Sequence, residues 1–224
     1  MIVSVEEFLA AVEKGETATV RHHLTADPSL VSARNPEGLS AIAIAAYWSR
    51  GEVLSMLLEA VPDLDLWEAS ITGNVDRIRD LVEQDPGLTG ERSPDGFTAL
   101  HLATFFGHEA AARFLVDRGA DVLARTSNAL ANQPIHAAVA GSDAEGRLAC
   151  ARVLLDAGAL PNELQSGGFT PLMSAAQNGD RALVDLLLDR GADPSLRDDE
   201  GRSAADHARA AGHDDIAVLL TPDP

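Results

Sequence analysis

The sequence predicts an all-α fold, a solenoid of about seven stacked helix–turn–helix pairs. Two observations carry this prediction. Three segments align with one another by eye, and they begin at Gly96, Asn132 and Gly168. Equivalent positions recur at a nearly constant period, since Thr170 and Ser203 are 33 residues apart and Thr98 and Gln133 are 35 apart. A period of this length is typical of repeated helical units.

Each part of the repeat has a physical reason. A threonine or serine caps the first helix, proline fits its first turn, and small alanines let neighbouring helices approach closely. Glycines at 107, 179 and 212 are expected to end that helix in the left-handed conformation. Leucine pairs then bury the second helix. Because one pair cannot bury its own apolar face, the pairs must stack.

The best segments read "GFTALHLATFFGHEAAARFLVDRGADV" from Gly96 and "GFTPLMSAAQNGDRALVDLLLDRGADP" from Gly168. They resemble the ankyrin repeat, with its turn glycine, Thr-Pro-Leu-His, paired alanines, Gly-His, and Leu-Leu before Gly-Ala-Asp. The resemblance implies a helix-pair solenoid with β-turn fingers. It also implies protein recognition in a concave groove, which is the main use of that fold.

The pairs follow one another along the whole chain, and we expect a single domain over residues 1–224. An N-terminal capping pair fills residues 1–35, with helices over 5–14 and 16–24. Internal repeats fill residues 36–200, and a C-terminal capping pair fills 201–224 and finishes at Pro222. Within the internal region the second pair opens at Ser40, the third spans 64–84, and pairs four to six are the aligned segments.

Two departures from the period mark irregular points. Ser40 and its expected equivalent Leu64 are only 24 residues apart, so the finger between the second and third pairs is missing. Trp67 is expected to replace the motif histidine there and to fill the gap. The fifth pair carries about four extra residues around 142–147, measured against the repeat period. They are expected to lengthen the turn between its helices into a lip.

Composition excludes several classes of partner. The formal charge of −18 repels phosphate backbones, so we expect no nucleic acid and no anionic membrane. A basic partner is allowed but not required, because acidic residues also form an ordinary solvated surface. No apolar run reaches the ~18 residues that a membrane span needs. The start at Met1 lacks the pattern of a secretory signal, so we expect a cytoplasmic protein. We also expect a monomer.

Enzyme signatures are missing, and we expect no catalytic residue, metal or cofactor. The chain has no G-x-S-x-G, no phosphate-binding loop and no H-E-x-x-H. The resemblance gives His101 and His136 a hydrogen bond to the backbone of the adjoining turn, and it makes His108 and His213 consensus residues. The other three histidines, His22, His23 and His207, are expected to be exposed. Paired acids at 199–200 and 214–215 are assigned to a turn and a helix start, and the lone Cys150 to a buried thiol.

Aromatic residues gather where ankyrin repeats bind partners. The resemblance places the two residues before each helix-ending glycine, and those beside the turn glycine, in the groove. Aromatic side chains bury a large area with few rotamers to freeze, so they often anchor interfaces. Phe97 and Phe169 have an alternative role as packing between neighbouring repeats. The predicted partner-binding residues are Tyr47, Trp48, Trp67, Phe97, Phe105, Phe106, Phe169, Gln177 and Asn178.

Three functions remain open at this point. The first is a non-catalytic module that binds a protein segment in the groove. The second is a small-molecule or enzymatic site between the second and fourth pairs, for which repeat position nominates Asp65, Glu68 and His101. The third is a homo-oligomer that buries the same groove against itself.

Overall fold

The computed structural model describes residues 4–61 and 63–221, and within them it contains fourteen α-helices arranged as seven antiparallel pairs. The prediction of an all-α stack of about seven pairs is therefore confirmed. Met1–Val3, Pro62 and the predicted end at Pro222 lie outside the described residues. The pairs are α1 (Val5–Lys14) with α2 (Thr17–Ala26), α3 (Ala41–Tyr47) with α4 (Gly51–Ala60), α5 (Leu66–Thr72) with α6 (Val75–Gln84), α7 (Ala99–Phe105) with α8 (Glu109–Asp117), α9 (Pro134–Ala140) with α10 (Ala144–Asp156), α11 (Pro171–Gln177) with α12 (Arg181–Asp189), and α13 (Ala204–Ala210) with α14 (Asp214–Leu219).

The predicted start and stop signals of the first helices are confirmed. The Ser40 and Thr170 side chains each accept a hydrogen bond from the backbone N–H three residues on, at 3.2 Å in both cases. Gly107 and Gly179 end α7 and α11 at φ 78° and 70°. A Cβ at Gly179 would also lie 2.4 Å from the ring of His213, so the left-handed turn and the close ring both require glycine here.

One continuous core runs through the stack from Phe8 to Leu220. Leucines, isoleucines and valines of both helices in each pair fill it, and alanines of the first helices lie fully buried where neighbouring pairs meet. Cys150 is part of this core. Burial raises the pKa of its thiol to about 12, so the thiol stays protonated, as expected of a structural cysteine.

Fingers connect most pairs. Four are closed by isolated antiparallel bridges, and the finger before α9 is closed by a hydrogen bond from Thr126 N to Asn132 O of 2.9 Å. Five residues join α4 to α5, and no bridge closes them among the described residues, which agrees with the missing finger. The bridged pairs are Arg34 with Ser40, Arg92 with Thr98, Gln165 with Phe169, and Arg197 with Ser203.

The register at the missing finger differs from the prediction by one residue. Asp65, not Leu64, caps α5, and its carboxylate accepts from Glu68 N at 2.8 Å while Glu68 accepts from Asp65 N at 3.0 Å. Glu68 therefore takes the place of the motif histidine, and Trp67 takes the place of the motif leucine. The assignment of Trp67 to the histidine position was wrong, because an acidic cap and an acidic third residue form their own capping box.

The predicted lip in the fifth pair is also wrong. Residues 141–143 form an ordinary connection, and the extra residues lengthen α10 to 13 residues, compared with 9 in α8 and α12. Asp143 explains this, because its carboxylate caps the new first turn at Gly146 N, 2.7 Å away. A Cβ on Gly146 would lie 2.6 Å from Gly107, so this glycine lets the longer helix pass over α7's end.

The motif histidines hold neighbouring repeats together as expected. His101 Nε2 lies 3.2 Å from Asn132 O, and His136 Nε2 lies 3.0 Å from Glu163 O. Burial lowers the pKa of both histidines to about 4, so both are neutral at pH 7. His207 corrects the prediction of exposure. It is buried, with Nε2 2.8 Å from the Asp198 carboxylate, because α13 packs against the finger that precedes it.

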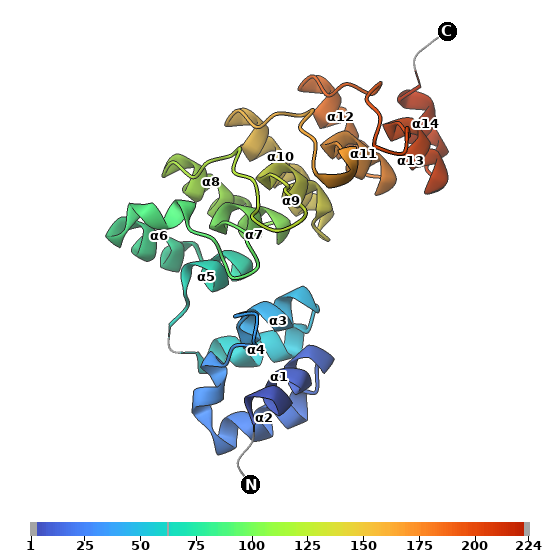
Figure 1. Ribbon diagram of the computed structural model, residues 1–224. Helices are drawn as coiled ribbons and strands as arrows, with labels where there is room; N and C mark the ends of the chain where they lie inside the picture. The colour runs from blue at the N-terminus through green and yellow to red at the C-terminus, as the bar shows by residue number, and fades with distance from the viewer. Residues whose placement is uncertain (1–3, 62, 222–224) are drawn as a thin grey trace.

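The stack curves, and its shape changes at the missing finger. Figure 1 shows the first helix of each pair on the inner side of the curve and the second helix on the outer side. It also shows that the stack turns between α1–α4 and α5–α14, and that the ribbons of α3 and α5 lie farther apart than those of the later neighbouring pairs. The loss of one finger thus coincides with a bend in the solenoid.

Candidate partner-binding groove

Three of the predicted aromatic side chains stack across the ends of α3 and α7. The ring centroids of Tyr47 and Phe106 are 5.7 Å apart, and those of Phe106 and Phe105 are 5.1 Å apart in an edge-on arrangement. Both distances lie in the favourable range for aromatic pairs. Residues from the second and fourth pairs therefore meet directly, which the missing finger between them permits.

The hydroxyl of Tyr47 fixes this arrangement. It donates to Asp95 Oδ2 at 2.8 Å, and Asp95 lies on the finger before α7. Burial, followed by the negative charge of Asp95, raises the pKa of Tyr47 above its usual value of 10.0. The fingers on either side of the missing one also touch, since a Cβ on Gly38 would lie 3.0 Å from Pro94.

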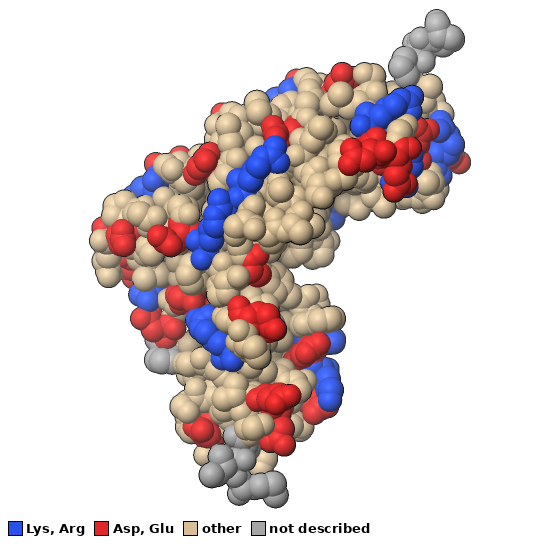
Figure 2. Space-filling model, viewed as in Figure 1, with Lys and Arg blue, Asp and Glu red and all other residues tan. Residues whose placement is uncertain are grey.

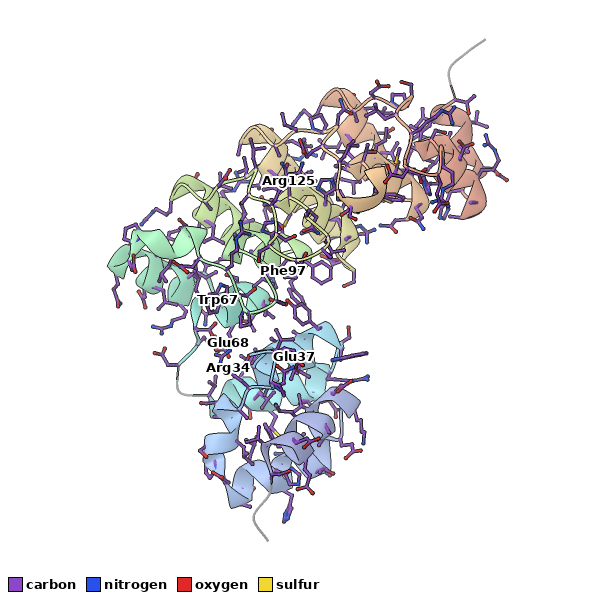
Figure 3. All side chains as sticks on the ribbon, viewed as in Figure 1. Arg34, Glu37, Trp67, Glu68, Phe97 and Arg125 are labelled. Atoms are coloured by element: carbon purple, nitrogen blue, oxygen red, sulfur yellow. The ribbon has the colours of Figure 1, made fainter. Side chains whose placement is uncertain are left out.

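A second apolar cluster lies beneath these rings and is separate from the main core. Its buried members are Ala43, Ile71 and Leu102, from the first helices of pairs two, three and four. The partly buried residues around it are Leu39, Ala46, Tyr47, Trp67, Phe97 and Phe106. Four predicted partner-binding residues therefore belong to one cluster. Trp67 packs at the position of the missing finger, as expected (Figure 3).

Two of the predicted aromatic residues present large surfaces to solvent. Trp48 is 53% exposed and Phe105 is 36% exposed. With Tyr47 and Phe106 they form what we call the aromatic strip (Tyr47, Trp48, Phe105 and Phe106). The strip combines a rigid buried side with an exposed side, which is the form that interface anchors take.

The other predicted residues lie apart from the strip. Phe169 packs on the ring of His207 with centroids 4.5 Å apart, so its alternative role as packing between repeats holds. Gln177 and Asn178 are exposed at the end of α11. Asn178 also donates to Val139 O at 3.2 Å, which links α11 to α9.

The polar residues nominated for a small-molecule site do not face one pocket. Asp65 and Glu68 bind each other's backbone and also Arg34, whose guanidinium lies 2.8 and 3.6 Å from their carboxylates (Figure 3). They line a cavity of about 20 Å³ together with Tyr47 and Trp67. That volume holds about one water molecule. His101 lines a different cleft.

The cleft beside the strip was missed by sequence reasoning. We call it the anchor cleft (Phe97, Phe105, Leu130, Asn132, Ala137 and Ala140). Its volume is about 250 Å³, and Tyr47, His101, Leu102, His136 and Gln165 complete its lining. Leu130 and Asn132 lie in the finger before α9. The spacing from Thr98 to Gln133 is two residues longer than the regular repeat, and this was the one feature of the sequence that could have indicated an unusual finger there.

Charge is distributed unevenly along the curved face. Figure 2 shows acidic side chains mixed with basic ones at both ends of the molecule, and between the ends a mostly tan area that a band of basic side chains crosses. At the N-terminal end, Glu6 and Glu13 line an open hollow of about 630 Å³ with Leu9, Ile44 and Arg34, whose guanidinium is paired with Asp65. Neither of these two carboxylates forms an ion pair with another described residue. Arg125, on a middle finger, is paired with Glu163.

The part of the chain that the structure describes offers neither a membrane span nor a metal site. No helix there is long and apolar enough to cross a membrane. Within the same residues, no group of three or more His, Cys, Asp or Glu side chains is placed to hold a metal ion.

The sequence is similar to known repeat proteins over most of its length. A model of ankyrin repeats in three copies matches residues 8–126 and 66–165, and a model of ankyrin repeats in many copies matches 147–208. Neurogenic locus notch homolog protein 2 of Homo sapiens is 32% identical over 192 residues, and protein 1 of Danio rerio is 31% identical over 191, each covering 85% of this chain. A transient receptor potential cation channel subfamily A member 1 homolog of Caenorhabditis elegans is 33% identical over 152 residues, or 68% of this chain. The chain spans only 7% of the length of the two notch homologs and 12% of the channel homolog.

Proposed function

Since this chain belongs to the ankyrin-repeat family, whose members are generally protein–protein interaction modules, we propose that it binds an extended segment of another protein along its concave groove. The single observation that supports this most is the aromatic strip. Phe105 is exposed and packs edge-on against Phe106, so binding it freezes little additional motion, and Trp48 adds a large exposed surface directly after Tyr47 at the end of α3. No catalytic step is part of the proposal.

Charge complementarity defines the partner further. The chain carries a formal charge of −18, and Glu6 and Glu13 extend the apolar groove with two unpaired carboxylates. A segment with apolar residues at its centre and basic residues toward its ends matches this surface. Complementary charge raises the association rate more than the final affinity, and added salt screens it. Binding should therefore slow as ionic strength rises.

The test is affinity capture from the native cell extract with the wild-type chain and with Trp48→Ala plus Phe105→Ala. Neither side chain belongs to the main core, so we expect the double variant to fold. We expect loss of at least one specific protein that the wild type captures, with at least about a tenfold fall in its affinity. The matched control is Val218→Ala plus Leu219→Ala, which removes exposed apolar surface from α14 at 75% and 39% exposure.

Equal capture by all three proteins would contradict the assignment of the groove. Sedimentation equilibrium over a range of concentrations examines the other occupant, a second copy of this chain. The proposal expects a monomer at every concentration. A dimer that dissociates in the Trp48→Ala plus Phe105→Ala variant would overturn it, because the groove would then be buried against itself.

A further inference from the structure

The anchor cleft is shaped for one side chain. Its volume of about 250 Å³ lies below the roughly 300 to 1,000 Å³ of sites that enclose a drug-sized ligand. It opens beside Phe105, which is also part of the aromatic strip. A segment that lies on the strip therefore passes over the mouth of the cleft, where a single side chain can enter.

The lining favours an aromatic side chain. Phe97 packs edge-on against His101 with ring centroids 6.0 Å apart, and Phe105, Leu130 and Ala137 supply further apolar wall. No charged side chain lines the cleft among the described residues. A charged group would lose its hydration there without gaining a partner, so lysine, arginine and carboxylate side chains are disfavoured.

Asn132, which lines the cleft, has one polar atom that is left unpaired. Asn132 is 7% exposed, and its side-chain Oδ1 is buried without a hydrogen-bond partner among the described residues. Its backbone is fully used, since Asn132 N donates to Thr126 Oγ1 at 3.2 Å, and Asn132 O accepts from Thr126 N at 2.9 Å and lies 3.2 Å from His101 Nε2. The backbone thus fixes the position of Asn132, and the carboxamide is left for another group. An unsatisfied buried carboxamide is costly, and a donor from a partner would remove that cost.

We propose that the anchor cleft receives one tyrosine side chain of the bound segment, with the phenol hydroxyl hydrogen-bonded to the Asn132 carboxamide. This rests on the proposed function, because the segment must lie along the groove. A phenol hydroxyl both donates and accepts, so it suits either orientation of the carboxamide. Phenylalanine fills the same space but leaves Asn132 unpaired, which predicts selection of tyrosine over phenylalanine.

The cleft can be tested without the partner. The probes are p-cresol, which is the tyrosine side chain, and toluene, which is the phenylalanine side chain. Each is titrated into the full chain and followed by NMR shifts of backbone and side-chain amides. We expect saturable millimolar binding of p-cresol, with shifts at Asn132, Ala137 and Ala140, and about fivefold weaker binding of toluene.

Two variants distinguish the contribution of the Asn132 hydrogen bond to probe binding from the contribution of the cleft's volume. Asn132→Leu keeps the size of the side chain but removes the polar group, so p-cresol and toluene should bind equally well. Ala140→Leu fills the cleft from its rim, and both probes should lose binding. Ala210→Leu is the matched control, because Ala210 is the exposed last residue of α13 as Ala140 is of α9. Ala140 is exposed, so Ala140→Leu tests the cleft even if Asn132→Leu fails to fold.

The outcomes are distinct from those of the capture experiment. Absence of saturable p-cresol binding, equal affinity of the wild type for both probes, or unchanged binding in Ala140→Leu would each overturn the cleft assignment. If p-cresol binds as expected but the aromatic-strip variant captures the same proteins as wild type, the groove proposal fails while the cleft stands. If capture depends on the strip but p-cresol does not bind, only the tyrosine inference fails.

Discussion

At the scale of single residues, Tyr47 links two repeats that are not sequence neighbours. Its ring packs on Phe106, and its hydroxyl donates to Asp95 across the position of the missing finger. A phenolate next to the Asp95 carboxylate would be repelled by it and poorly hydrated. The native structure therefore requires the protonated phenol.

The titration of Tyr47 is directly measurable, because it is the only tyrosine of the chain. Its folded pKa is raised above 10.0, so native stability is fully present below about pH 10 and is lost as pH rises further. We expect the phenolate absorbance at 295 nm to appear only together with loss of helical circular dichroism. The urea-unfolded chain is the control and should titrate near 10. Phenolate formation near pH 10 with intact helices would contradict the buried hydrogen bond.

The two motif histidines, His101 and His136, should make the stability of the protein fall at low pH, whereas Tyr47 makes it fall at high pH. Their folded pKa values of about 4 lie below the usual 6.5, so the stability that they confer is present above pH 6.5 and is lost as pH falls toward 4. The loss should be on the order of 1 kcal/mol per pH unit for each histidine. Urea unfolding at pH 7 and at about pH 5.5 measures it. His136→Gln should flatten the dependence, whereas His22→Gln, at an exposed position, should leave it unchanged.

Residue roles that follow from the local motif were predictable from the sequence, and roles that depend on the third dimension were not. The backbone partners of His101 and His136 followed from the repeat. His207 did not, because its partner Asp198 lies on a finger whose distance to α13 only the fold defines. The exposure of Trp48 and Phe105 agrees with the groove positions. Asn132 was missed because its free carboxamide is visible only once its backbone contacts are known.

At the scale of elements, the caps of the first helices control local stability. Gln133 opens α9 where other pairs have serine or threonine, and its side chain makes no capping hydrogen bond while Oε1 is buried and unpaired. Gln133→Thr should stabilise the chain by about 1 kcal/mol, because threonine accepts from the N–H of His136. Thr98→Gln is the reciprocal variant and should destabilise by a similar amount. Urea unfolding midpoints measure both. A lower midpoint for Gln133→Thr would show that the longer side chain is needed for packing.

The exact start of a helix could not always be predicted from the repeat period of the sequence. The number of helix pairs and the missing finger were predicted from the repeat motif and its spacing. The extra residues of the fifth pair were expected in a loop. The repeat period shows how many residues are inserted, but it does not show whether they belong to the loop or to the helix that follows. Asp143 caps the helix early and places them in α10. At α5 the acidic capping box of Asp65 and Glu68 moved the start by one residue.

At the scale of the whole molecule, the junction between α1–α4 and α5–α14 combines few polar links with the aromatic strip. Among the described residues, the polar links that cross it are those of Arg34 to Asp65 and Glu68, and that of Tyr47 to Asp95. Stability in a repeat stack depends on such interfaces between neighbours. The division of residues 1–224 into one domain with two caps stays a prediction.

The coupling across this junction can be measured by hydrogen exchange. In Arg34→Ala plus Tyr47→Phe, we expect the amides of α3 and α4 to exchange faster, while those of α11 and α12 keep their protection. Arg118→Ala is the control, since its partner Glu83 lies within the closely stacked pairs. A uniform change in all helices of the double variant would indicate that the junction is no weaker than the rest of the stack.

The central claim is that the groove binds a protein segment through the aromatic strip, and selection from a random peptide display library tests it most directly. The account predicts enriched peptides that share a tyrosine with basic residues around it. Their binding should be lost with Trp48→Ala plus Phe105→Ala and kept with Val218→Ala plus Leu219→Ala. Peptides that bind the strip variant as tightly as the wild type, or the absence of any enriched peptide, would contradict the claim.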